Sequence, residues 1–187
     1  MRVIDVVISL LWIVFWIYWL IAAIGTRGAR SLSRGYASTG PRVAVLLLIL
    51  LLLLLRTNVL QGHTGVVDNP LLQGIGVGVL VLGLALAVWA RLYLGRNWGT
   101  PMSEKVDPEL VTAGPYRRVR HPIYSGLILA MIGTALAIGI YWLIACVLVA
   151  AYFVYSATVE ERNMTRLFPA TYPAYKRSTK MLIPFVV

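Results

Sequence analysis

The sequence predicts an all-α integral membrane protein with about five transmembrane helices. Three observations support this fold class. Hydrophobic residues make up 59% of the 187-residue chain and charged residues only 13%, whereas soluble domains are less apolar and more charged. The apolar residues form long continuous runs, and the positive charges gather in the segments that would lie on one side of a membrane. The length fits a single unit, residues 1–187, with three helices in residues 1–90 and the candidate site in residues 91–187.

Three of the five apolar runs lie in the N-terminal part. They are Val3–Ile24, a run centred on Val43–Leu55 that can extend to about Leu60, and Leu71–Ala90. A membrane crossing needs roughly 20 apolar residues, so each run can form one span. Four glycines line the third run, and we interpret them as helix-packing positions; they are Gly74, Gly76, Gly78 and Gly83.

The fourth and fifth spans come from one apolar block, Ile123–Val159. This block is too long for one crossing, so it predicts two helices joined by a tight turn near Gly139. Two helices with so short a connection must be antiparallel neighbours. The start of the fourth helix and the end of the fifth are therefore expected to lie side by side.

The distribution of Lys and Arg predicts the orientation of the chain. Only Arg2 and Arg56 lie in the segments on one side of the membrane. Cytoplasmic segments carry the excess of positive charge, which predicts an external N-terminus and a cytoplasmic C-terminus. The same bias explains the net charge of +10 without a nucleic-acid partner. The other 15 basic residues lie on the cytoplasmic side and are Arg27, Arg30, Arg34, Arg42, Arg91, Arg96, Lys105, Arg117, Arg118, Arg120, Arg162, Arg166, Lys176, Arg177 and Lys180.

Cysteine and histidine are rare in the chain. Its one cysteine, Cys146, cannot form an internal disulfide. One cysteine and two histidines do not suffice for a structural zinc site, so we expect no metal.

The first chemically distinctive segment is Asp107–Gly126, which precedes and enters the fourth span. Pro122 suits the first turn of a helix, which places His121 at or next to the N-cap. The unpaired N–H groups of such a helix start attract anionic groups or hydrogen-bond acceptors.

A turn at Gly114-Pro115 is expected to fold the preceding stretch back toward this helix start. Tyr116 and Tyr124 add aromatic faces. An arginine-rich loop before a membrane helix is often only a topology signal, and we interpret Arg117 and Arg118 in that way.

The second distinctive segment is Glu160-Glu161, at the end of the fifth span. The pair could merely neutralise Arg162 and Arg166, or it could capture a cation. The antiparallel helices bring it next to His121. Carboxylates, helix N–H groups and tyrosine rings together suit a zwitterionic cofactor with a cationic centre such as a sulfonium.

The run Leu110–Tyr116 followed by Arg120–Gly126 resembles the isoprenylcysteine carboxyl methyltransferase family. Related membrane methyltransferases that act on phospholipid amines or small thiols share much of this pattern. The resemblance covers roughly residues 91–185. It continues in order through Glu160, Glu161, Phe168, Tyr172, Tyr175, Ile183 and Pro184.

The resemblance implies that S-adenosylmethionine binds from the cytoplasmic side, in a pocket formed by the start of the fourth helix, the end of the fifth and the C-terminal tail. Glu160 would lie near the amino group of the cofactor. Pro108 and Glu109 match the family pattern only by position. The implied cofactor contacts are Pro108, Glu109, Leu110, Val111, Tyr116, His121, Pro122, Ile123, Tyr124 and Glu160.

The acceptor of the methyl group stays open in the sequence. Family members that methylate the prenylcysteine carboxylate carry an arginine one helical turn before the glutamate pair, where this chain has Ser156. A carboxylate acceptor needs a cation, for which Arg120 and Arg166 are candidates. An amine acceptor must lose a proton, for which Glu161 and His121 are candidates.

A lipophilic acceptor would enter sideways from the lipid of the inner leaflet. Two other classes compete with a methyltransferase. One is a non-enzymatic membrane scaffold or transporter subunit, which leaves the His-Pro-x-Tyr and Glu-Glu units unexplained. The other is a nicotinamide-dependent reductase, for which the cytoplasmic loops offer little room.

The charge distribution makes the orientation testable. Single-cysteine variants at Ser38 and Thr64 should react with a membrane-impermeant thiol reagent from opposite sides, Ser38 from the cytoplasm and Thr64 from outside. Labelling of Thr64 from the cytoplasm alone would show that the predicted orientation is wrong.

Overall fold

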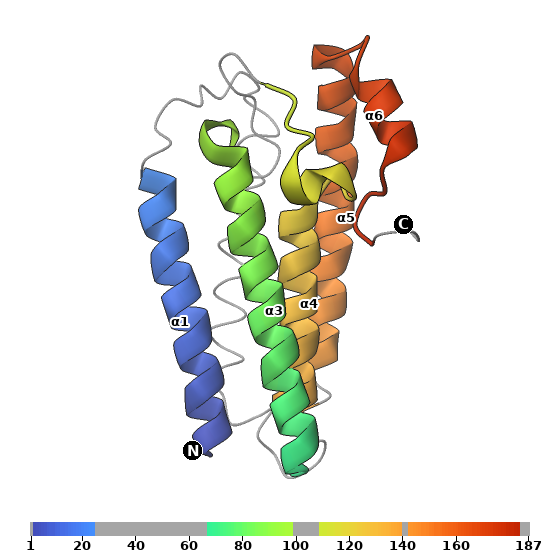
Figure 1. Ribbon diagram of the computed structural model, residues 1–187. Coiled ribbons are helices and arrows are strands. Elements are labelled where there is room, and N and C mark those ends of the chain that lie inside the picture. Colours follow the sequence, from blue (N-terminus) through green and yellow to red (C-terminus); the bar gives the residue numbers. More distant parts are fainter. Residues whose placement is uncertain (1, 25–66, 99–108, 140–141, 184–187) are drawn as a thin grey trace.

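The computed structural model describes residues 2–24, 67–98, 109–139 and 142–183 (Figure 1). The predicted second span, Val43–Leu55 with its extension to Leu60, lies outside these residues, as do Pro108 and Pro184. The described part of the chain is helical and contains no strand. The all-helical fold predicted from the sequence is thereby confirmed.

Three of the helices are long and apolar enough to cross a membrane: α1 (Val3–Ile24), α3 (Pro70–Leu94) and α5 (Trp142–Leu167). A fourth apolar helix, α4 (Pro122–Ile138), is shorter. The protein is therefore an integral membrane protein. Figure 1 shows these helices running side by side as one bundle.

The helix bounds follow local signals in the sequence. The side chain of Asn69 caps α3 by accepting hydrogen bonds from the backbone N–H groups of Leu71 and Leu72, at 2.9 and 3.2 Å. His121 is the N-cap of α4 and Pro122 its first residue, as predicted. The turn after α4 begins at Gly139, also as predicted.

α5 is longer than the apolar pattern predicts. It continues past Val159 to Leu167, because the residues that follow the apolar block include good helix formers and the first proline comes at 169. Glu160 and Glu161 therefore lie on the helix itself. Consecutive residues on a helix point about 100° apart, so the two carboxylates face different neighbours.

Small residues form the contact between α3 and α4. A Cβ built on Gly76 would lie 2.6 Å from the backbone nitrogen of Ala137, and one built on Gly83 would lie 2.4 Å from that of Ala130. Close approach of this kind is a common way for membrane helices to associate. The packing role predicted for the glycines holds for these two, whereas Gly74 and Gly78 have nothing within 4 Å of a built Cβ.

α1 joins the bundle through a polar contact within the membrane and through its two ends. The indole N–H of Trp12 donates to Thr134 Oγ1 at 3.1 Å. At the start of α1, Arg2 pairs with Asp5 at 2.9 Å and donates to the carbonyl of Val67 at 3.1 Å. At its other end, the carbonyl of Ala22 accepts from Arg91 Nη2 at 3.0 Å.

The segments after α3 and α5 fold onto the same end of the bundle. The short turn η2 (Gly114–Arg117) begins at a glycine with φ of 59°, where a Cβ would meet the ring of Tyr93 at 2.5 Å. This confirms the predicted turn. A short helix, α6 (Tyr172–Ser178), lies beside the end of α5 (Figure 1) and was not predicted.

The glycine contact between α3 and α4 predicts unequal effects of one substitution at two positions. Gly83→Ala pushes a methyl group into the α4 backbone and should destabilise the protein by about 1–3 kcal/mol. Gly78→Ala is the matched control on the same helix and should be neutral or slightly stabilising, because alanine is the better helix former. Thermal unfolding in detergent measures both. Equal melting temperatures would contradict the packing role of Gly83.

Candidate functional site

The start of α4 and the end of α5 meet as predicted, and His121 lies between the two glutamates. Its Nδ1 is 3.5 Å from Glu160 Oε2, and its Nε2 is 3.5 Å from Glu161 Oε1. The imidazole is only 10% exposed. Among the described residues, no well-aligned hydrogen bond reaches Nε2. The helix start thus carries one buried imidazole against two carboxylates.

The two neighbouring glutamates shift the pKa of the imidazole. Burial alone would lower the pKa of His121, but the contacts with Glu160 and Glu161 outweigh burial, and the pKa lies above its usual 6.5. Nearby negative charge favours the protonated form. His121 therefore holds a proton more tightly here than in water.

Two hydroxyl groups hold the carboxylate of Glu160. The phenol of Tyr124 donates to Glu160 Oε1 at 2.5 Å, and Ser156 Oγ lies 3.3 Å from the same oxygen. Tyr124 and Ser156 also contact one another at 3.3 Å. The hydrogen bond from Tyr124 is short, and hydrogen bonds to an ionised carboxylate are strong, so it fixes the orientation of Glu160.

An aromatic stack extends from the imidazole into the bundle. The ring of His121 stacks on Tyr124 with centroids 5.5 Å apart, and Tyr124 stacks on Phe153 at 4.5 Å, each pair with an interplanar angle of 6°. The stack joins α4 to α5 directly beneath Glu160. It gives the site one apolar, aromatic side.

Glu161 contacts His121 and also belongs to an ion-pair network that extends toward the C-terminal tail. Its Oε1 lies 2.6 Å from Arg120 Nε, and its Oε2 lies 2.7 Å from Lys176 Nζ. The side chains of Arg120 and Glu161 are only 8% and 3% exposed. Each oxygen of this carboxylate therefore has a cation as its partner.

Arg120 also fastens the C-terminal tail to the bundle. Its Nη1 donates to the backbone carbonyls of Thr179 and Lys176. The backbone N–H of Arg120 donates to Lys180 O at 2.8 Å, and that of His121 donates to Met181 O at 3.1 Å. The tail therefore packs against the start of α4.

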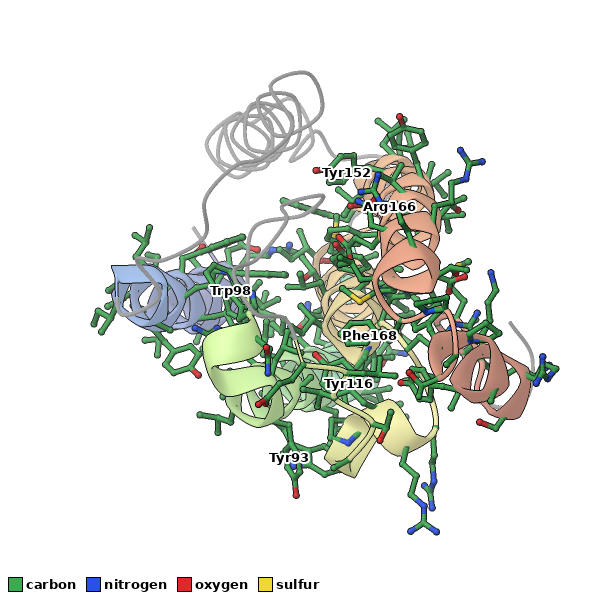
Figure 2. The ribbon with its side chains drawn as sticks, turned by 90° about the horizontal axis from the view of Figure 1, so that it is seen from above. Tyr93, Trp98, Tyr116, Tyr152, Arg166 and Phe168 are labelled. Atoms are coloured by element: carbon green, nitrogen blue, oxygen red, sulfur yellow. The ribbon has the colours of Figure 1, made fainter. Side chains whose placement is uncertain are left out.

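Tyr116 lies close to the same end, which Figure 2 views from above. There Tyr116 and Phe168 lie near the centre of the view, between the end of α3 and α6. Tyr175 donates from its phenol to the carbonyl of Tyr116 at 2.6 Å. Burial raises the pKa of Tyr116, and the negative charge of Glu160 raises it further. Burial also raises the pKa of Tyr175, to about 12, so both phenols stay neutral.

The other residues predicted to contact the cofactor lie either in the first turn of α4 or in the segment before η2. Pro122 is buried and Ile123 half-buried in the first turn of α4, next to the site. Glu109 pairs instead with Asn97, whose Oδ1 accepts from the Glu109 backbone at 3.1 Å. Leu110 and Val111 follow it as half-buried residues before η2.

The third residue predicted for catalysis, Arg166, lies about one and a half turns beyond the glutamates. It is exposed on α5, and its Nη2 lies 3.3 Å from Asn163 Oδ1. Arg120 and Glu161, in contrast, contact each other. The catalytic roles of all three residues stay predictions.

Comparison with known proteins shows the family to which the chain belongs. The model of the phospholipid methyltransferase family matches residues 72–171, which is more than half of the chain. The match includes most of α3 and the whole of η2, α4 and α5. The chain belongs to this family. All residues of the site described above except those of the tail lie within the match.

Individual members of this group of methyltransferases are also similar to the chain. A protein-S-isoprenylcysteine O-methyltransferase of Schizosaccharomyces pombe is 28% identical over 118 residues, 61% of this chain and 50% of that protein. Protein-S-isoprenylcysteine O-methyltransferase B of Arabidopsis thaliana is 26% identical over 126 residues, 65% of this chain and 64% of that protein. These two matches confirm the resemblance predicted from the motifs.

A methanethiol S-methyltransferase 1 of Bradyrhizobium diazoefficiens is 38% identical over 82 residues, 44% of this chain and 28% of that protein. The match spans less than two thirds of the length of each of these three relatives.

Two parts of the site in this member of the phospholipid methyltransferase family were not predicted from the sequence. Lys176 was counted only among the basic residues that set the orientation of the chain, although it pairs with Glu161. Phe153 and Ser156 were not assigned to the site. Their spacing to Glu160 is a detectable signal, because residues 153, 156 and 160 share one face of a helix.

Proposed function

We propose that this protein transfers a methyl group from S-adenosylmethionine to a lipophilic acceptor held in the membrane. One observation carries the proposal. A carboxylate, Glu160, is fixed by Tyr124 and Ser156 at the end of a membrane helix, beside a buried histidine and an aromatic stack. The family match and the names of the relatives support the same reaction.

The residues present fit the cofactor. S-adenosylmethionine carries an ammonium group, a carboxylate and a sulfonium, and it supplies the methyl group when bound. Glu160 is the group that would hold the ammonium, because its side chain is 27% exposed and already oriented. The start of α4 favours an anion, which suits the carboxylate.

The surroundings of Arg120 and Glu161 suit residues that position the site better than residues that contact the substrate. Both are nearly buried, and Glu161 has a cation at each oxygen. Their ion pair joins the residue before His121 to the residue after Glu160, and so holds both neighbours in place. Alignment of reactants is the main task in a displacement of this kind, so a positioning effect can be large.

His121 is the stronger candidate for moving a proton. Its pKa is raised while both glutamates face it. A cation held by Glu160 reduces the negative charge around the imidazole and lowers its pKa. The neutral imidazole is then able to accept a proton from an acceptor that must lose one.

We consider three chemical classes of acceptor. The names of two relatives favour a prenylcysteine carboxylate, the name of a third favours a small thiol, and the description of the family favours a phospholipid amine. Incubation of the purified protein with labelled S-adenosylmethionine and a prenylated cysteine, methanethiol or phosphatidylethanolamine distinguishes them. We further propose that the site faces the cytoplasm, with the N-terminus outside, on the basis of the distribution of basic residues.

The role of Glu160 can be tested by cofactor binding. Glu160→Gln keeps the shape of the side chain and removes its charge. Loss of a charge-assisted hydrogen bond costs about 1.5–3 kcal/mol, which is about 10- to 150-fold in affinity for S-adenosylmethionine or its demethylated product. Calorimetry in detergent measures the affinity.

Arg118→Ala is the control, because Arg118 is exposed and we assign it only a topological role. Folded protein that gives no binding heat with either ligand would rule out the proposed cofactor. Parent-like binding by Glu160→Gln, together with a loss in Arg118→Ala, would place the pocket elsewhere.

A further inference from the structure

A basic hollow lies on the tail side of the site. It encloses about 360 Å³ between the end of α6 and the segment that follows it. Four of its lining residues are cations, and no acidic residue is among the lining residues that the structure describes. The lining residues are Arg120, Lys176, Arg177, Ser178, Thr179, Lys180 and Met181.

The four cations are not equivalent. Arg120 and Lys176 have Glu161 as their partner. The side chains of Arg177 and Lys180 are exposed, and neither has an ion pair or hydrogen bond to another described residue. Two uncompensated positive charges therefore line the hollow next to two compensated ones.

The backbone around the hollow is held in place. Residues 179 and 180 lie against the start of α4, because Lys180 N donates to Arg118 O at 3.2 Å and Lys180 O accepts from Arg120 N at 2.8 Å. Ser125 Oγ donates to Leu182 O two residues further along. The cations are thus presented from a fixed loop, which lowers the entropy cost of binding a ligand.

The position of the hollow points to the lipid–water boundary. Its walls are built next to the first turn of α4 and the last turns of α5, both ends of apolar membrane helices. One lining residue, Met181, packs against the buried cluster of Tyr124, Phe153, Ala157 and Leu182. The hollow therefore combines cations with an apolar side chain.

We propose that this hollow binds the headgroup of an anionic phospholipid, with Arg177 and Lys180 as the main contacts to its phosphate. Basic residues next to membrane helices attract anionic lipid. The apolar side chain of Met181 and the place at the helix ends favour a lipid over a free phosphate ion. Neither Glu160 nor His121 lines the hollow, and it needs no methyl transfer to be occupied.

A binding titration tests the assignment. The full-length protein in a neutral detergent is titrated with dioctanoyl phosphatidylglycerol, and its melting temperature is followed by tryptophan fluorescence. A ligand that binds only the folded state raises the melting temperature. We expect a saturable rise with this lipid and a smaller one with dioctanoyl phosphatidylcholine, whose headgroup has no net charge.

The variant that tests the site is Arg177→Gln/Lys180→Gln. Each basic residue near a lipid phosphate contributes about fivefold in affinity, so the double variant should need about 25-fold more phosphatidylglycerol for half of the rise. Arg117→Gln/Arg162→Gln is the matched control. It removes the same charge from exposed positions outside the lining and should titrate like the parent.

Three results would overturn the proposal. Equal weakening in both double variants would mean that the charges act only as a general surface attraction. Equal stabilisation by the two lipids would exclude an anionic headgroup. Glycerol phosphate binding as tightly as the lipid would make the hollow a site for soluble phosphates. Because all readouts are binding and unfolding, failure here leaves the proposed methyl transfer untouched.

Discussion

The ion pair between Arg120 and Glu161 is the interaction on which the functional end of this protein depends. It joins the residue before His121, at the start of α4, to the residue after Glu160, near the end of α5. The same arginine holds the backbone carbonyls of the tail. Burying two charges costs solvation energy, and the pair offsets that cost only because its hydrogen-bonding groups have partners. Its geometry therefore fixes three segments at once.

The ion pair between Arg120 and Glu161 also determines how the neighbouring Glu160 is oriented. Glu161 turns toward the tail, so Glu160, about 100° around the helix, turns toward Tyr124 and Ser156. A second constraint supports α4 from behind, because Gly83 lets its backbone approach that of α3 closely. The result is one oriented carboxylate at the edge of an aromatic stack, at the end of a membrane bundle.

Much of this arrangement could be predicted from the sequence, because it follows from length and periodicity. The apolar runs predicted the spans that the structure describes. The tight turn at Gly139 predicted that α4 and α5 are neighbours, and therefore that His121 lies near Glu160. The partners of individual charges could not be predicted. Arg120 was predicted to hold the carboxylate of a methyl acceptor, whereas its partner in the structure is Glu161. The sequence alone does not show which of the many basic residues pairs with which carboxylate. The α6 helix was missed because seven residues form a helix only with tertiary support.

A double-mutant cycle on the ion pair tests the account most directly. Arg120→Gln, Glu161→Gln and the double variant are compared with the parent by thermal unfolding and by affinity for the demethylated cofactor product. If the pair holds the site together, the double variant is hardly worse than either single variant, with a coupling free energy of about 1–3 kcal/mol. Cofactor affinity falls in parallel in all three. Additive losses, or full cofactor affinity in the destabilised variants, would contradict the account.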